Sequence, residues 1–181
     1  MCGVDLQKMK IGITGSSKLA KYLIDNVDAE WTSYRLIDGD ISSSCAFDCD
    51  VFINQAHVEW EQIELMEKFY HRWKDDDSKL LINISSRASQ PNISKGYKYS
   101  AQKAALNHFS NNLIYNSPKK FRLTTLNLGL IEDELSSLTY SDIADTILYV
   151  LRNDHLEVAE ITVSHKENYQ SVQQQKSKRY L

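Results

Sequence analysis

The chain has 181 residues, 42% of them hydrophobic, which suffices for one domain with its own core. A net charge of −3 at pH 7 excludes a strongly basic surface of the kind that binds nucleic acids. No apolar run reaches membrane-spanning length and no signal-peptide pattern opens the chain, so we expect a cytoplasmic protein that contacts no membrane.

Strand-length apolar runs alternate with helix-length periodic segments along the first half of the chain. The predicted elements there are a strand at residues 10–14, a helix at about 17–27, a strand at 33–37, a strand at 50–54 and a helix at about 58–73. The stretch between 39 and 49 is too short and irregular for a further helix. Its cysteines, Cys45 and Cys49, together with Cys2 fit neither a redox pair nor a metal site, so we expect free thiols and no bound metal.

The second half of the chain continues the same alternation. The predicted elements are a strand at 79–85, a helix at about 99–115, a strand at 122–127, a helix capped by Ser141 and a strand at 157–164. The mostly apolar strand at 79–85 is typical of a central strand buried on both faces. The pattern predicts one doubly wound, Rossmann-like α/β domain over residues 1–164, with a parallel sheet of about six strands. Residues 165–181 are expected to form a polar C-terminal tail.

Ser86, Tyr99 and Lys103 form the pattern with the clearest chemistry. Tyr99 and Lys103 are one turn apart on the predicted helix, so their side chains share a face. Ser86 stands thirteen residues before Tyr99, and the two other tyrosines with a lysine at the same spacing have no serine there. A nearby cation and a helix start both favour a phenolate, so these groups can move a proton to or from a carbonyl oxygen. The alternative is a surface tyrosine and lysine on an amphipathic helix.

The surrounding motifs resemble those of the short-chain dehydrogenase/reductase family. YSAQKAAL begins at Tyr99, INISS ends at Ser86, and NLGL begins at Asn127. The resemblance covers roughly residues 10–164 and implies an NAD(P)-dependent oxidoreductase that interconverts a small-molecule carbonyl and its alcohol. It implies that Tyr99 exchanges the proton, that Ser86 hydrogen-bonds the substrate oxygen, and that Lys103 also holds the nicotinamide ribose.

The resemblance also assigns a dinucleotide site to loops that follow predicted strands. The family's glycine-rich turn corresponds to TGSSKLAK, and its NNAG motif corresponds to NQAH. The residues expected to bind the cofactor are Thr14, Gly15, Ser16, Ser17, Lys18, Leu19, Asp38, Asn54 and Ala56, together with Tyr99 and Lys103. The alternative for the first loop is an ordinary strand-to-helix turn with a serine cap.

The choice between NAD and NADP depends on charge at the adenosine end of the site. Asp38 follows the predicted strand at 33–37, and a carboxylate there binds the adenosine hydroxyls and repels a 2′-phosphate, which favours NAD. Arg35 and Lys18 argue for NADP, and Asp38 also suits an ordinary turn before Gly39. Both cofactors therefore stay open.

Several residues depart from the family pattern. Lys18 and Ala20 stand where glycines are usual, so their side chains would crowd a cofactor. His57 replaces another glycine, and Glu59 falls where the family has a relay asparagine. Residues 131–140 are too few for the usual substrate lid, which implies an open site. These departures support two alternatives: a catalytically impaired binding or regulatory protein with a degenerate cofactor site, or a subunit that needs a partner to close its active site.

The remaining candidates are interpreted as structural. His57 is expected to pack or to form a hydrogen bond at a strand end, and Trp31, Trp60 and Trp73 are expected in the core or in an interface. Family members commonly pair through two of their helices, so the resemblance implies a homodimer or homotetramer.

Overall fold

The computed structural model describes residues 5–37, 40–41, 44–90, 96–132 and 137–167. Six parallel strands form the main sheet in the order β2-β1-β5-β6-β7-β8. Their bounds are β1 Lys10–Thr14, β2 Glu30–Tyr34, β5 Val51–Asn54, β6 Leu80–Ser86, β7 Arg122–Leu128 and β8 Glu160–Val163. The prediction of a Rossmann-like α/β domain with about six parallel strands is confirmed.

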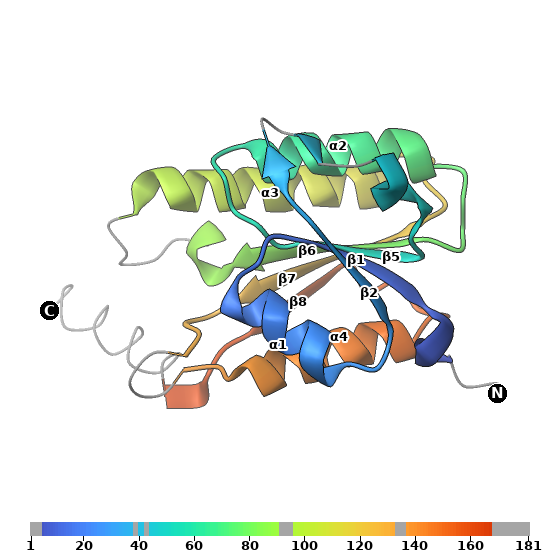
Figure 1. Cartoon of the computed structure of the whole chain (residues 1–181). Helices are drawn as coiled ribbons and strands as arrows, with labels where there is room; N and C mark the ends of the chain where they lie inside the picture. The colour runs from blue at the N-terminus through green and yellow to red at the C-terminus, as the bar shows by residue number, and fades with distance from the viewer. Residues whose placement is uncertain (1–4, 38–39, 42–43, 91–95, 133–136, 168–181) are drawn as a thin grey trace, which may run out of the picture.

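Two helices cover each face of the main sheet (Figure 1). One face carries α1 Lys18–Asn26 and α4 Tyr140–Arg152, and the other carries α2 Glu61–Trp73 and α3 Tyr97–Asn116. Short 3-10 turns lie at η1 Leu6–Lys8, η2 Ser44–Asp48 and η3 Arg87–Ser89. Because the helices turn their apolar stripes toward the sheet, each face has its own hydrophobic core.

The central strands are apolar because both of their faces are covered. All of β5 is buried, and so is all of β6 except Ser86 at its end. Successive side chains alternate between the two cores, with Phe52 on the α2–α3 face and Ile53 on the α1–α4 face. The expected central position of this apolar run is confirmed.

The edge strand differs from the predicted strand at 33–37. β2 Glu30–Tyr34 pairs with β1, whereas Leu36–Ile37 form β3, which pairs antiparallel with β4 Asp40–Ile41 in a separate small sheet. Within β2 only Tyr34 is buried, because an edge strand has one neighbour and its other side chains can stay polar. The apolar residues that suggested a longer strand belong instead to the small hairpin.

The starts of three helices also differ from the predictions, and the first of these, α2, begins at Glu61 and not at about 58. Thr139, not Ser141, caps α4: the Thr139 hydroxyl accepts from the Asp142 amide at 3.2 Å, and the Asp142 carboxylate accepts from the Thr139 amide at 2.8 Å. This reciprocal pair satisfies two amides that the helix itself leaves unpaired. α3 begins at Tyr97, earlier than predicted, and it ends at Asn116 shortly before Pro118, where a helix stop was expected.

The tryptophans and cysteines largely follow their expected structural roles. Trp73 is buried in the core, and its indole nitrogen donates to the Phe47 carbonyl at 2.9 Å. Trp31 is half-buried, whereas Trp60 is 44% exposed. Cys45 and Cys49 are free thiols, as expected, and Cys2 lies outside the described residues. Burial raises the pKa of the Cys49 thiol to about 12, so it behaves as an inert packing group.

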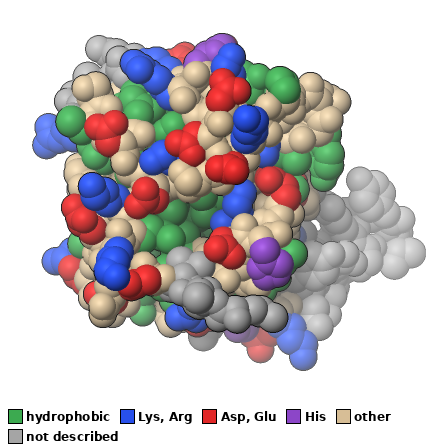
Figure 2. Space-filling model, turned by 90° about the vertical axis from the view of Figure 1, so that its right-hand side faces the viewer, with side chains coloured by type: hydrophobic (Ala, Val, Ile, Leu, Met, Phe, Trp, Pro, Cys, Tyr) green, Lys and Arg blue, Asp and Glu red, His purple; other side chains and the backbone are tan. Residues whose placement is uncertain are grey.

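The face shown in Figure 2 carries Lys and Arg side chains interspersed with Asp and Glu. Ion pairs at the amino-terminal ends of the strands follow the same mixed pattern, with Lys79 3.7 Å from Asp50 and Lys119 3.2 Å from Glu157. Mixed charges of this kind give no single-sign field. Among the helices of the described residues, none combines the length and apolarity needed to cross a membrane.

Candidate active site

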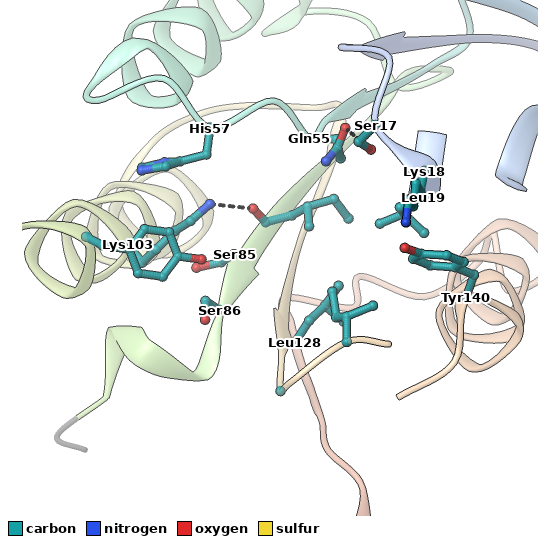
Figure 3. Close-up of a pocket in the computed structure, with 14 residues that line it drawn as sticks. Ser17, Lys18, Leu19, Gln55, His57, Ser85, Ser86, Lys103, Leu128 and Tyr140 are labelled. Atoms are coloured by element: carbon teal, nitrogen blue, oxygen red, sulfur yellow. Dashed lines mark hydrogen bonds between the residues drawn. The ribbon is translucent and has the colours of Figure 1, made fainter. Parts of the chain in front are cut away.

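A cavity of about 400 Å³ lies at the carboxyl ends of the central strands. Figure 3 shows Lys103, Ser85 and Ser86 on one side of it, with Lys18, Leu19 and Tyr140 on the opposite side. Its wall is completed by Ser17, Gln55, His57, Ile84, Tyr99, Leu128, Gly129 and Ile131. In an open α/β sheet this edge is the usual position of a ligand site.

Ser86, Tyr99 and Lys103 all contribute to the wall of this cavity. Ser86 ends β6, and the other two lie on the first turns of α3, so a strand end and a helix start bring them to one place. The Ser86 hydroxyl oxygen accepts from the Ala88 amide at 3.1 Å, which leaves its proton for a donor role. Tyr99 is 37% exposed, so a molecule in the cavity can reach its ring.

Lys103 is a buried cation with protein acceptors. Its side chain is 3% exposed, and Nζ donates to Gln62 Oε1 at 2.5 Å. A second bond runs from Nζ to the Ile84 carbonyl at 2.9 Å and is the dashed line at Lys103 in Figure 3. Nζ also lies 5.6 Å from the centroid of the Tyr99 ring. Burial lowers the pKa of Lys103 to about 8, so the ammonium form still predominates at pH 7. A positive charge is therefore fixed beside the Tyr99 ring.

His57 packs edge-on against Tyr99, with 4.8 Å between ring centroids and 89° between the ring planes. Burial, and then the charge of Lys103, lower the pKa of His57 below its usual value, so the imidazole is neutral at pH 7. This contact agrees with the expectation of a packing residue, and it fixes one side of the Tyr99 ring.

The turn after β1 is built around Gly15 and Thr14. Gly15 has φ +87°, and a Cβ there would lie 3.2 Å from the Ala56 Cβ, so the turn requires glycine. The buried Thr14 hydroxyl accepts from the amides of Gln55, at 2.8 Å, and Ala56, at 2.9 Å. Thr14 therefore joins the ends of β1 and β5 through its hydroxyl.

Ser17 and Lys18 bring the start of α1 to the cavity. Ser17 caps the helix, since its hydroxyl accepts from the Ala20 amide at 3.1 Å, and it donates to Gln55 Oε1 at 3.1 Å. Lys18 is the first helical residue and lines the cavity. A helix start with a lysine attracts anions. Ala20, expected to crowd a cofactor, is fully buried in the α1–α4 core instead.

The other residues expected to bind a cofactor have different positions. Asn54 is fully buried, and its amide nitrogen donates to the Gln62 carbonyl at 2.8 Å and to Asn83 Oδ1 at 3.0 Å. Gly15, Ser16 and Ala56 lie in the loops beside the cavity but are not among its lining residues. Asp38 lies outside the described residues, as does the tail from 168 onward. Because β2 ends at Tyr34, the first residue after the edge strand is Arg35, not Asp38.

Sequence reasoning missed Gln62. It is 2% exposed on the inner face of α2, and its Nε2 donates to the carbonyls of Asn54, at 2.9 Å, and Ile84, at 3.2 Å. Glu59, which the family comparison placed at the relay position, is exposed and pairs with Lys98 at 2.6 Å. The available signal was a glutamine on the apolar stripe of a predicted helix, where a polar residue needs a buried partner.

Sequence reasoning also missed Tyr140, which lines the cavity from the first turn of α4. Its ring lies 5.8 Å from that of Tyr22 on α1, and its amide donates to the Glu132 carboxylate at 3.0 Å. Backbone hydrogen bonds between Leu130 and Leu138, at 2.8 Å, and between Glu132 and Leu138, at 2.9 Å, close the short segment that stands where a lid was expected. The described part of this segment thus supplies a ring to the cavity wall.

Solved structures share this fold. Serine dehydrogenase from Escherichia coli matches with a TM-score of 0.63 and 17% identity, over 86% of this chain and 86% of that one. 3-Ketoacyl-(acyl-carrier-protein) reductase from Brucella melitensis, complexed with NADH, matches with a TM-score of 0.67 and 15% identity, over 91% and 100%. FolM alternative dihydrofolate reductase 1 from Brucella canis, complexed with NADP, matches with a TM-score of 0.70 and 11% identity, over 91% and 96%.

No protein-family model and no curated protein matches the sequence. Identities of 11–17% carry the likeness of fold but not an activity. The chemistry of this chain therefore depends on the residues of its own cavity.

Proposed function

We propose that this chain, which has the fold of the short-chain dehydrogenases/reductases, is a nicotinamide-dependent oxidoreductase that interconverts a small-molecule carbonyl and its alcohol. One observation carries the proposal: Ser86, Tyr99 and Lys103 contribute to the wall of a single cavity at the carboxyl ends of the strands. The same cavity reaches the capped start of α1, so proton-transfer groups and an anion-attracting helix end share one space.

Each of the three residues has a defined task in carbonyl reduction. The Ser86 hydroxyl donates a hydrogen bond to the carbonyl oxygen and polarises it. When bound, the reduced nicotinamide supplies the hydride to the carbonyl carbon. The Tyr99 phenol gives its proton to the same oxygen, which completes the alcohol, and Lys103 stabilises the phenolate that remains. In alcohol oxidation Tyr99 takes the proton back. Exchange with solvent then restores the starting form.

The residues around the helix start suit a dinucleotide. Lys18, the Ser17 cap and the first amides of α1 form a positively polarised end for a pyrophosphate. The φ of +87° at Gly15 keeps a side chain out of the turn that a phosphate would approach. On this proposal Lys103 also holds the nicotinamide ribose, since two of its three donors already have protein acceptors.

On this proposal the choice between NAD and NADP stays open: Asp38, which favours NAD, lies outside the described residues, and the position of Arg35 favours NADP. Arg35 is the first residue after the edge strand, where a guanidinium binds a 2′-phosphate, and Lys18 adds a further positive charge to the site. Since neighbours of the same fold are complexed with NADH or with NADP, the fold itself is compatible with either. Comparing the affinities of NADPH and NADH tests this choice.

A two-stage assay tests the proposed function. Calorimetric titration with NADPH and with NADH first measures cofactor binding. A panel of aldehydes and ketones then tests whether the reduced cofactor is consumed. Saturable binding and turnover of at least one carbonyl are expected. Binding without any turnover would support the alternative of a cofactor-dependent regulatory protein. If neither dinucleotide binds at millimolar concentration, the proposal fails.

A further inference from the structure

We infer that Gln62 is a positioning residue that holds the Lys103 ammonium at the cavity wall through a neutral amide, without cancelling its charge. The inference rests on the proposed function, because Lys103 is one of the residues assigned there to proton transfer. Gln62 lies in the first turn of α2, outside the Ser-Tyr-Lys pattern, and approaches Lys103 from a different element of the fold.

A buried ammonium needs acceptors. Lys103 is 3% exposed, so water cannot replace a lost protein partner. Its two protein acceptors in the described structure are Gln62 Oε1 at 2.5 Å and the Ile84 carbonyl at 2.9 Å. The Ile84 carbonyl is part of β6 and cannot be removed by substitution. Gln62 is therefore the side chain on which the position of Nζ depends.

The Gln62 amide is locked in one orientation. Its Nε2 donates to the carbonyls of Asn54 and Ile84, at 2.9 Å and 3.2 Å. A flip of the amide would point NH₂ at the Lys103 ammonium and would aim Oε1 at two carbonyl oxygens, leaving repulsive contacts on both sides. The Asn54 side chain in turn donates to the Gln62 backbone carbonyl at 2.8 Å, which ties this turn of α2 to the end of β5.

An amide holds the cation without neutralising it. A carboxylate at position 62 would form a buried ion pair with Lys103 and would neutralise its positive charge. The carboxylate of Glu59, in the loop that leads to α2, is exposed and pairs with Lys98. The titratable groups that face Lys103 are Tyr99 on its own helix and the neutral His57 imidazole on the loop after β5. The charge therefore stays available to a phenolate or to a ribose.

Two substitutions with opposite electrostatic effects test the inference. Gln62→Glu adds a negative partner and should raise the pKa of Lys103 from about 8 by one unit or more. Gln62→Met keeps the length, removes the acceptor and should lower that pKa. The measurement is an NMR titration of the full-length protein with isotopically labelled lysine side chains, with the Lys103 signal assigned by its loss in Lys103→Arg.

Controls separate positioning from general destabilisation. Gln102→Met removes another buried glutamine amide, one that contacts His57 and makes no hydrogen bond to Lys103, and should shift the Lys103 titration less than either Gln62→Glu or Gln62→Met. Gln62→Asn keeps the amide on a shorter side chain and should fall between wild type and Gln62→Met. If Gln62→Glu and Gln62→Met shift the Lys103 titration in the same direction, or not at all, the inference is overturned. Thermal unfolding of each variant shows whether it is folded.

Turnover separates this inference from the proposed function. If the carbonyl assay works, both Gln62→Glu and Gln62→Met should lower kcat about tenfold or more, with a smaller change in KM and a displaced pH profile. Opposite NMR shifts in a protein that never turns over a carbonyl would uphold the role of Gln62 and contradict the proposed function. Full turnover in both variants with unchanged pH profiles would contradict the role of Gln62 alone.

Discussion

The β6–α3 wall of the cavity and its β1–α1 wall are built in different ways. On the first wall, a seven-residue strand and a twenty-residue helix carry Ser86, Tyr99 and Lys103. Other polar side chains bond across these two elements, Ser85 to Asn107 and Asn83 to Ser110. On the second, a five-residue strand and a nine-residue helix meet at a turn, and the serine-capped start of the helix, with Lys18 and Leu19, forms the surface. Two long regular elements thus build the first wall, whereas a single helix start after a short turn builds the second.

A chain of hydrogen bonds makes the β6–α3 wall continuous with the far edge of the sheet. The Ser85 hydroxyl donates to Asn107 at 2.6 Å, Asn107 donates to Asn127 at 2.7 Å, and Asn127 donates to Glu160 at 2.5 Å. These groups join β6, α3, β7 and β8. The wall that carries the proposed proton transfer is therefore cross-linked by side chains, and each link can be broken separately.

The largest effect is expected at Tyr99. Tyr99→Phe removes the proton donor, so kcat for carbonyl reduction should fall by about 10²–10⁴-fold while cofactor affinity changes only a few-fold. Tyr115→Phe is the matched control, because Tyr115 lies on the same helix, has a lysine at the same spacing and is 73% exposed. Equal activities of the two variants would show that the β6–α3 wall is not the site of proton transfer.

The next effect is a pH dependence of stability that comes from Lys103. Its pKa is lowered from 10.5 in the unfolded chain to about 8, so the unfolded state binds more protons between these values. The stability of the wild type relative to Lys103→Met should therefore rise by about 3 kcal/mol from pH 8 to pH 10.5. Urea unfolding across this range measures the slope. Lys8→Met, at a side chain 86% exposed, is the control for removing a surface lysine, and a flat difference for Lys103→Met would refute a buried ammonium.

A smaller loss is expected when the chain of hydrogen bonds is cut at Asn127. Asn127→Ala leaves the Asn107 amide and the Glu160 carboxylate without one partner each and opens a small cavity, at a cost of about 2–3 kcal/mol in the free energy of unfolding. Asn116→Ala, at the exposed end of α3, should cost less than about 0.5 kcal/mol. Similar losses in both variants would show that the network adds no stability.

The smallest effect is expected at the turn of the β1–α1 wall. Gly15→Ala forces a side chain into a backbone with φ +87° and toward the Ala56 Cβ, at a cost of about 1–2 kcal/mol. The same change should weaken dinucleotide binding. Gly96→Ala is the control, because Gly96 has φ −79°, which any residue adopts. If both glycines tolerate alanine equally well, in stability and in cofactor affinity, the turn is not constrained as described.

The two walls also differ in how well the sequence predicts them. The i,i+4 spacing of Tyr99 and Lys103 and the apolar run before Ser86 are local signals, and the structure brings all three residues to the cavity. The fold is predictable for the same reason, because the alternation of strands and helices is also a local signal in the sequence. Gln62 is different, because its proposed role depends on Lys103. That partner lies on α3, and no sequence spacing connects it to α2.

The β1–α1 wall was harder to predict because its geometry is set by tertiary contacts. β2 is a polar strand, and its position in the chain is set by pairing with β1 and not by its own hydrophobicity. The strand expected from the apolar pattern, at 33–37, therefore lies further along the chain than β2. Ala20 stands where the family motif has a glycine, so it was expected to crowd a cofactor, but in the folded helix it faces the core. Thr14 matches the family motif, yet its hydroxyl is used between two strand ends.

A crystal structure with NADP at millimolar concentration tests the central claim most directly. We expect the pyrophosphate at the amides of Ser17–Leu19 and the nicotinamide ring beside Tyr99 and Ser86, with Lys103 within hydrogen-bond distance of the ribose. A dinucleotide bound elsewhere, or a cavity that stays without one while Tyr99, His57 and Tyr140 keep their positions, would contradict the account.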